Sequence, residues 1–194
     1  MFTGIIQATA RVQAVSEAKK IKWVRIAAPR GWKLPLGASV NVDGICSTVA
    51  KKGGGFFEVE YMSETLSKTT AGRFTKGVLL NLERSLKYGQ PVDGHLVQGH
   101  VDCAAPIREV VHRGSSRELT IKPNAAFARG AMLHGSIAVN GVSLTIAKKH
   151  GPNITVALIP YTLKHSNLGS LKAGDTVNVE FDHSLAYLDK AHRR

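Results

Sequence analysis

Short runs in which polar and apolar residues alternate, or in which β-branched and aromatic residues gather, recur along the chain. The run at 39–42, Ser-Val-Asn-Val, alternates regularly, and the run at 136–139 does so more weakly. Alternation with a period of two indicates a strand with one buried face, and β-branched and aromatic residues favour strands. The sequence therefore predicts strands at 39–42, 56–61, 79–83, 136–139, 154–159 and 176–180.

Turn and helix signals lie between these runs. Asp43-Gly44 and Asn140-Gly141 each follow a predicted strand directly, and an Asx-Gly pair in this position is a strong signal for a two-residue β-hairpin. We expect short helical turns at 64–70 and 161–167. Residues 184–191 carry a mostly apolar stripe and predict one helix, which should pack on something because a lone exposed helix of this length is marginal in water.

The second half of the chain repeats the first. Shifted by 97 positions, residues 39–83 align without a gap with residues 136–180, and Gly4-Ile5-Ile6 matches Gly99-His100-Val101 at a slightly smaller offset. A period this long indicates a duplicated domain rather than a solenoid. We expect homologous domains at 1–88 and 89–183, followed by a tail at 184–194. Short strands in halves of this size suggest an all-β fold of small closed barrels.

Composition and charge narrow the class of protein. Of the 194 residues, 43% are hydrophobic and 21% charged, which is enough for a packed core. Lys and Arg exceed Asp and Glu by 26 to 14, giving a net charge of +12. The basic residues are dispersed and no nucleic-acid motif accompanies them, so a solvated basic surface or steering of anions is expected, with no nucleic-acid partner.

Cysteine usage and hydropathy suggest a location in the cell. Two cysteines, Cys46 and Cys103, cannot form a disulfide framework, so a reducing compartment is expected. No apolar run approaches the length of a membrane span, and the first residues lack the features of a signal peptide. We therefore expect a cytoplasmic protein with no membrane partner.

The densest cluster of polar residues lies at 93–102, where His95 and His100 stand beside two glycines. On a strand the two histidines would face opposite sides, and no cysteine lies at metal-ligand spacing. We expect no metal here. Each histidine taken alone is equally consistent with a structural hydrogen bond, and His95 is expected to support turn structure more than chemistry.

Cys46 and Ser143 occupy the same position in the two repeats, three residues after the Asx of each Asx-Gly turn. A small residue there is consistent with packing. A nucleophile would need an activating neighbour, and the sequence does not show one.

Several motifs occur in order along the chain. They are Met1-Phe2-Thr3-Gly4-Ile5, Gly-Ile-Cys-Ser-Thr-Val at 44–49, Glu64-Thr65-Leu66, Asn81-Leu82-Glu83-Arg84, the run at 94–102, Asn-Gly-Val-Ser-Leu-Thr at 140–145, and Leu158-Ile159-Pro160. Each is weak alone, but together they cover both repeats and resemble the riboflavin synthase family, alpha-chain type, whose chains are tandem lumazine-binding barrels.

The resemblance implies a fold and an activity. It implies two six-stranded, Greek-key-like β-barrels in tandem, and a short C-terminal helix that builds a homotrimer. It also implies dismutation of two 6,7-dimethyl-8-ribityllumazine molecules to riboflavin and 5-amino-6-(ribitylamino)uracil, the last step of riboflavin biosynthesis, with no cofactor. Two identical substrates need two similar pockets, and a duplicated barrel supplies them. In the family each active site lies between the N-barrel of one subunit and the C-barrel of its neighbour.

The resemblance also implies site residues. The catalytic candidates are His100 as acid or base, Cys46 and Ser143 for nucleophilic assistance or polar contact, and Asp182 to orient groups at the mouth of the C-barrel. Phe2 and Ser39 would lie close to the substrate rings. The N-barrel pocket would contain Gly4, Ile5, Ile6, Cys46, Ser47, Thr48, Glu60, Tyr61, Met62, Ser63, Glu64 and Thr65. The C-barrel pocket would contain Gly99, His100, Val101, His134, Ser143, Leu144, Thr145, Ala157, Leu158, Ile159, Pro160, Tyr161 and Thr162.

Two positions depart from the family pattern. Ser47 stands where the family usually has Leu, so a hydroxyl there must find a partner if it is buried. His134 stands where the family commonly has Lys, which removes a permanent cation. An alternative to the enzyme is a non-catalytic, antenna-type lumazine- or flavin-binding protein on the same scaffold. Relatives of that kind lose the histidine-rich cluster, which is intact here.

Overall fold

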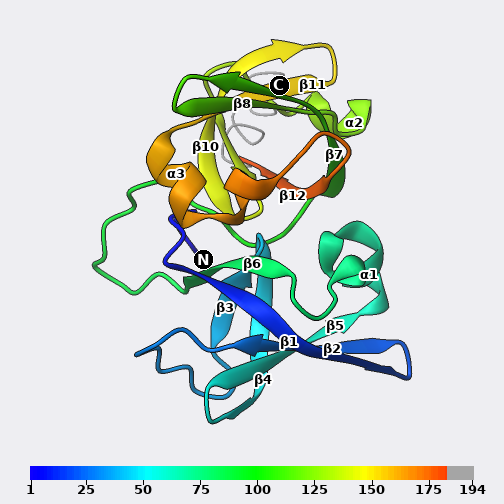
Figure 1. Cartoon of the computed structure of the whole chain (residues 1–194), viewed down its shortest axis with the longest axis vertical. Helices are drawn as coiled ribbons and strands as arrows, with labels where there is room; N and C mark the ends of the chain where they lie inside the picture. The colour runs from blue at the N-terminus through cyan, green and yellow to red at the C-terminus, as the bar shows by residue number, and fades with distance from the viewer. Residues whose placement is uncertain (183–194) are drawn as a thin grey trace, which may run out of the picture.

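The computed structural model describes residues 1–182, and these residues form two closed, six-stranded antiparallel β-barrels stacked end to end (Figure 1). The predicted helix at 184–191 lies outside the described residues. The N-barrel consists of β1 (Ala8–Ala18), β2 (Ile21–Ala27), β3 (Ser39–Val42), β4 (Ile45–Gly53), β5 (Phe56–Met62) and β6 (Leu79–Arg84). The C-barrel consists of β7 (Cys103–Arg113), β8 (Ser116–Ile121), β9 (Ser136–Val139), β10 (Val142–His150), β11 (Asn153–Leu158) and β12 (Thr176–Phe181).

Both barrels have the same strand order. Around the N-barrel the order is β1-β2-β5-β4-β3-β6, and the C-barrel repeats it with β7-β8-β11-β10-β9-β12. The pairing of β2 with β5 rather than with β3 gives the crossing connection of a Greek key. The fold class inferred from the sequence is therefore confirmed, and each of the six predicted strands overlaps an observed one.

The Asx-Gly pairs form the tight hairpins that the sequence predicts. Asp43 and Gly44 have φ of +48° and +87°, and Asn140 and Gly141 have φ of +45° and +78°. Positive φ at both central residues defines a type I′ turn, whose twist matches the flanking strands. These turns connect β3 to β4 and β9 to β10.

Each barrel has its own hydrophobic core, supplied by every second residue of its strands. In β4 the side chains of Ile45 and Val49 point inward and those of Cys46 and Thr48 point outward. One cluster of buried apolar residues fills the N-barrel and another fills the C-barrel. A small third cluster, made of Phe2, Val97 and Ala138, is separate from both barrel cores. The strand pattern thus sets which side chains remain available on the outside.

The two hairpin turns meet where the barrels join. The amide of Asn178 donates to the backbone oxygen of Asp43 at 2.7 Å, and the amide of Asn81 donates to the backbone oxygen of Asn140 at 3.0 Å. The two bonds are counterparts in the duplication. Asn167 also donates to Asp43 Oδ1 at 2.9 Å. Burial raises the pKa of Asp43 to about 8, so its carboxyl is largely protonated at neutral pH.

A short helical segment follows β5 in the N-barrel and β11 in the C-barrel, close to the turns predicted at 64–70 and 161–167. In the N-barrel these are α1 (Ser63–Lys68) and a 3₁₀ turn (Thr70–Arg73), and in the C-barrel they are α3 (Pro160–His165) and a 3₁₀ turn (Asn167–Ser170). A third helix, α2 (Ala125–Ala128), lies between β8 and β9.

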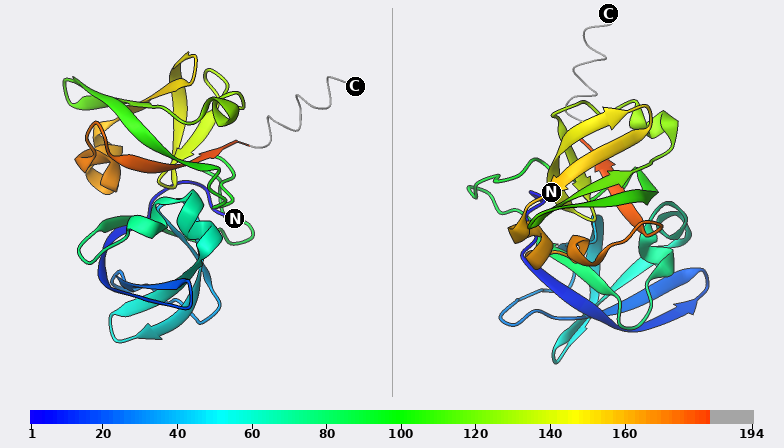
Figure 2. Two further views of the ribbon diagram at one scale, coloured as in Figure 1. Left: turned by 90° about the vertical axis from the view of Figure 1, so that its right-hand side faces the viewer. Right: turned by 45° about the horizontal axis from the view of Figure 1, so that its top comes forward.

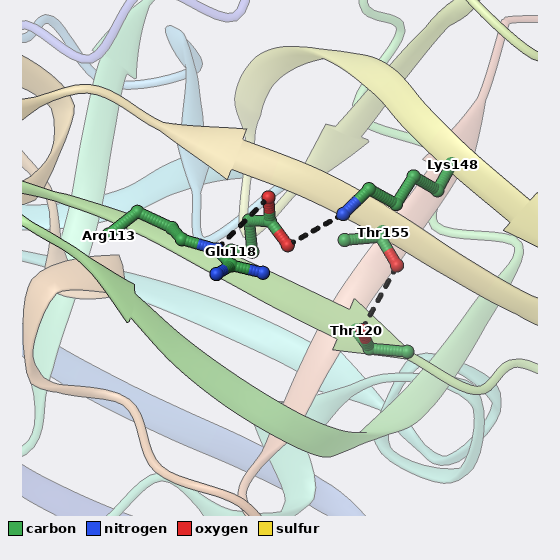
Figure 3. A network of polar contacts seen from close by, with 5 residues as sticks. All are labelled: Arg113, Glu118, Thr120, Lys148 and Thr155. Atoms are coloured by element: carbon green, nitrogen blue, oxygen red, sulfur yellow. Dashed lines mark hydrogen bonds and ion pairs between the residues drawn. The ribbon is translucent and has the colours of Figure 1, made fainter.

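The outer surface of the C-barrel carries polar contacts along β7, β8, β10 and β11. Glu118 pairs with Lys148 at 2.9 Å and with Arg113 at 3.6 Å, and the hydroxyls of Thr120 and Thr155 lie 3.0 Å apart (Figure 3). Hydrogen bonding to Lys148 is the main reason why the pKa of Glu118 is lowered. Ion pairs of this exposed kind contribute little to stability, so this face is a solvated surface.

Candidate functional site

An outward-facing patch on the N-barrel presents chemically reactive side chains. Cys46 and Thr48 project from β4, and Glu60 and Met62 project from the neighbouring strand β5, all of them exposed. The carboxylate of Glu60 accepts a hydrogen bond from Trp23 Nε1 at 2.8 Å. We call these four side chains the N-face.

The duplication places an equivalent patch on the C-barrel. Ser143 and Thr145 project from β10, and Ala157 of β11 and Ile159 after it complete the patch. We call these four side chains the C-face. The C-face has Ala157 and Ile159 where the N-face has Glu60 and Met62, so it is less polar.

The loops that complete the two faces cross between the barrels. Cys46 N donates to the carbonyl oxygen of Gly99 at 2.8 Å, and Ser143 N donates to the carbonyl oxygen of Gly4 at 2.8 Å. Figures 1 and 2 show the N-terminal segment lying between the barrels. Ile6 accordingly packs on the core of the C-barrel, and Val101 packs on the core of the N-barrel.

This crossing corrects one expectation drawn from the sequence. Gly4, Ile5 and Ile6 were assigned to the N-barrel pocket and Gly99, His100 and Val101 to the C-barrel pocket, but the backbone contacts join each triplet to the opposite barrel. The reason is that each segment runs past the end of its own barrel before its first strand begins. Gly99, the residue before His100, therefore lies against Cys46, and Gly4, the residue before Ile5, lies against Ser143.

Only glycine fits where each loop crosses. A Cβ on Gly99 would lie 2.7 Å from the Cβ of Cys46, and a Cβ on Gly4 would lie 2.6 Å from the Cβ of Ser143. Both glycines also have positive φ, +81° and +76°, which an L-residue adopts at a cost. The close approach holds each loop directly against the reactive side chain.

His95 is a polar neighbour of Ser143 that the sequence did not reveal. Its Nδ1 lies 2.7 Å from Ser143 Oγ. Burial lowers the pKa of His95, and the negative charge of Asp182 opposes that shift, so the ring is mostly neutral at neutral pH. His95 thus contacts the C-face directly, and its backbone N–H also donates to the oxygen of Thr3 at 3.2 Å. Its expected role in turn structure stays a prediction.

We expected no metal site here on the premise that the two histidines lie on a strand. The segment around them is not a strand. Residues 92–102 form a loop with one isolated bridge, between Val97 and Phe2. Within residues 1–182 no three metal-binding side chains come together. The repeat match in this segment begins at Gly99, so His95 has no aligned residue in the first repeat and the repeat could not indicate its role.

Besides Gly4 and Gly99, four of the expected binding residues are buried in the protein interior. Tyr61 and Leu158 point into the barrel cores, and Phe2 belongs to the small cluster with Val97. The Ser47 hydroxyl lies 2.8 Å from the Tyr61 hydroxyl and donates to the Ile45 oxygen at 3.0 Å. Strand alternation turns Ser47, Tyr61 and Leu158 inward, so these side chains support the faces from within rather than facing outward.

The remaining expected residues surround the two faces. Ser39 pairs with Thr48 across β3 and β4, and the half-buried Leu144 packs on the C-barrel core. His134 has φ of +65°, and its backbone N–H donates to the oxygen of Ile146 at 2.9 Å. Ser63, Glu64, Thr65, Pro160, Tyr161 and Thr162 all lie in α1 or α3.

Comparison with known proteins agrees with this duplicated architecture. The model of the lumazine binding domain family matches the chain twice, at residues 3–85 and 98–182. The riboflavin synthase of Brucella abortus (strain 2308) is 38% identical over 96% of this chain and 96% of its own length. The chain belongs to the riboflavin synthase family. It is thus an enzyme built on two lumazine-binding repeats.

Further members of the riboflavin synthase family match over nearly the full chain. The riboflavin synthase of Actinobacillus pleuropneumoniae is 33% identical over 98% of this chain and 89% of its own length. That of Escherichia coli (strain K12) is 32% identical over all of this chain and 92% of its own length.

Solved structures of LumP have the same fold. LumP complexed with riboflavin superposes with a TM-score of 0.87 at 22% identity, covering 94% of this chain and all of that chain. LumP complexed with flavin mononucleotide gives a TM-score of 0.84 over 94% of this chain and 99% of that chain. No helix within residues 1–182 of this riboflavin synthase family member is long and apolar enough to span a membrane.

Proposed function

We propose that this enzyme converts two molecules of 6,7-dimethyl-8-ribityllumazine into riboflavin and 5-amino-6-(ribitylamino)uracil. One lumazine donates a four-carbon unit and the other accepts it. The observation that carries the proposal is the pair of duplicated outward faces with unequal chemistry, one with Cys46 and His100 and the other with Ser143 and His95. Identical substrates that play different parts need two similar sites that differ in their reactive groups.

The C-face supplies a positioned hydroxyl. Burial lowers the pKa of His95 and keeps its ring neutral, so a ring nitrogen can accept the proton of Ser143 Oγ across 2.7 Å. A hydroxyl beside a neutral imidazole can act as a nucleophile toward the ring of a bound lumazine or donate a hydrogen bond to it.

The N-face supplies a second acid/base group. His100 is exposed and is held beside Cys46 by the hydrogen bond from Cys46 N to Gly99 O. We infer that His100 exchanges protons with the lumazine on this face, and that the Cys46 thiol contacts or adds to the same ring. Holding two rings face to face supplies much of the rate, because orientation alone can contribute several kcal/mol.

We further propose that the enzyme works as a homotrimer, in which the N-face of one subunit opposes the C-face of its neighbour. Exposed apolar side chains support this arrangement. Met62 is 70% exposed, and Ile159 and Ile5 are 59% and 42% exposed, which is typical of surfaces that bind a ligand or a partner chain. Sedimentation velocity with and without riboflavin measures the assembly, and a monomer that turns over substrate would contradict the proposal.

The decisive experiment is incubation of the enzyme with the lumazine alone. Riboflavin and the pyrimidine should appear in equal amounts, without added metal and in the presence of a chelator. The alternative is a non-catalytic lumazine- or flavin-binding protein, an idea supported by the LumP structures with riboflavin, flavin mononucleotide or the lumazine itself. Tight binding of the lumazine without riboflavin formation would favour that alternative.

A further inference from the structure

Two buried glutamates occupy equivalent positions at the ends of β6 and β12. Glu83 is 1% exposed and Glu180 is 3% exposed. Within residues 1–182 neither forms an ion pair with a cation; both accept hydrogen bonds from the loop that precedes the first strand of their own barrel. The sequence repeat aligns these two glutamates, but gives no reason for their burial.

The carboxylate of Glu180 binds three consecutive backbone N–H groups. Gln98 N donates to Oε1 at 2.6 Å, and Gly99 N and His100 N donate to Oε2 at 2.8 and 3.0 Å. The carbonyl of Gly99 in turn accepts from Cys46 N on the other barrel. One residue, Gly99, is thus fixed from both sides, and His100 follows it directly.

Glu83 binds the other loop in a similar way, through two backbone N–H groups and the hydroxyl of Thr3, which donates at 2.8 Å. Thr3 N donates to its carboxylate at 2.7 Å and Gly4 N at 3.0 Å, and Gly4 O accepts from Ser143 N. However, the residue that follows Gly4 is Ile5, which has no proton to exchange. The two glutamates therefore form a matched pair. Only the loop bound by Glu180 carries a residue that can exchange a proton, His100.

We propose that Glu180 is a positioning residue, which acts through the Gly99–His100 backbone to hold His100 beside Cys46. The inference rests on the proposed function, in which His100 exchanges protons with substrate. An uncharged amide cannot replace the carboxylate, because the NH₂ group of Gln donates and cannot accept from a backbone N–H. Burial also raises the pKa of Glu180 to about 6, with the charge of Asp102 adding to the shift, so the carboxylate predominates at pH 7.

The test is a double-mutant cycle on turnover. Glu180→Gln and Glu83→Gln are each made in the wild-type enzyme and in a His100→Gln background. Glu180→Gln should lower kcat about tenfold or more with a smaller change in KM, since loss of orientation acts on the chemical step. In the His100→Gln background the same change should lower kcat less than about threefold, because the two residues act as one unit.

Glu83→Gln is the matched control, since it removes the same kind of carboxylate from the other loop. It should lower kcat by the same factor in both backgrounds. If Glu180→Gln does so too, or leaves kcat unchanged, Glu180 does not act through His100. Should Glu180→Gln fail to fold, Glu180→Asp keeps the charge on a shorter side chain and enters the same cycle with the same two outcomes.

A readout without substrate separates this inference from the proposed reaction. The ring signals of His100 in ¹H–¹³C NMR, assigned by their loss in His100→Gln, should shift in Glu180→Gln and stay unchanged in Glu83→Gln. Unchanged His100 signals in Glu180→Gln would overturn the positioning role. Failure of wild-type turnover with the expected NMR shift would instead reject the reaction and leave the geometry intact.

Discussion

The crossing of the loop over Cys46 can be tested with two glycine substitutions of equal backbone strain. Gly99 and Gly89 both have φ of +81°. A Cβ on Gly99 would lie 2.7 Å from Cys46 N, whereas a Cβ on Gly89 would have nothing within 4 Å. Alanine at either position would have to adopt the left-handed conformation, which costs about 1–2 kcal/mol of stability. The difference between the two variants therefore isolates the close approach.

The size of that difference follows from the contacts at Gly99. A new methyl group cannot remain 2.7 Å from the backbone of Cys46, so the loop must move by roughly 1 Å to reach ordinary van der Waals distance. That movement breaks the 2.8 Å hydrogen bond from Cys46 N to Gly99 O. The lost bond and the strained packing together cost about 2 kcal/mol more than the change at Gly89.

Calorimetry at equal protein concentration measures the effect. A difference of about 2 kcal/mol lowers the melting temperature of a chain of this size by about 4–8 °C, so Gly99→Ala should melt that far below Gly89→Ala. Turnover should fall by up to about 100-fold in Gly99→Ala, since a displacement of 1 Å can have that effect, and should be nearly normal in Gly89→Ala. Equal melting temperatures and equal turnover would refute the crossing.

Three further predictions concern single side chains. His100→Gln should lower turnover more than about tenfold while riboflavin affinity, measured by fluorescence, changes less; near-normal turnover in the folded variant would remove His100 from the chemistry. Cys46→Ser and Ser143→Ala should both lower turnover, but unequally, because the Ser143 hydroxyl lies within hydrogen-bond distance of His95, whereas Cys46 carries a thiol on a face with other neighbours; equal, negligible effects would mean that both residues only pack. The ordinary pKa of Asp43 is 3.8, and burial raises it to about 8 in the folded protein. Between these two pH values the folded protein binds more protons than the unfolded chain. The free energy of unfolding should therefore fall as pH rises, by at most about 1.4 kcal/mol per pH unit. Asp43→Asn keeps an oxygen to accept from Asn81 N and should flatten that slope in denaturant titrations at several pH values; an unchanged slope would place the titrating group elsewhere.

Much of the fold could be predicted from the sequence because its signals are local. Alternating residues indicated strands, Asx-Gly pairs indicated the hairpins of Asp43 and Asn140, and self-alignment indicated the duplication. These features depend on side-chain direction and backbone preference over a few residues. The motif set was enough to place the chain in its family, since it spans both repeats.

The sequence by itself thus determined the two barrels and the presence of reactive side chains at Cys46, Ser143 and His100. Only the tertiary structure decided which groups meet. Gly99 accepts a hydrogen bond from Cys46 of the N-barrel, His95 contacts Ser143, and the hydroxyl of Ser47 contacts that of Tyr61. The physical reason is that strand periodicity fixes the face on which a side chain lies, whereas contacts between residues 14 to 53 positions apart depend on how strands and loops close around each barrel.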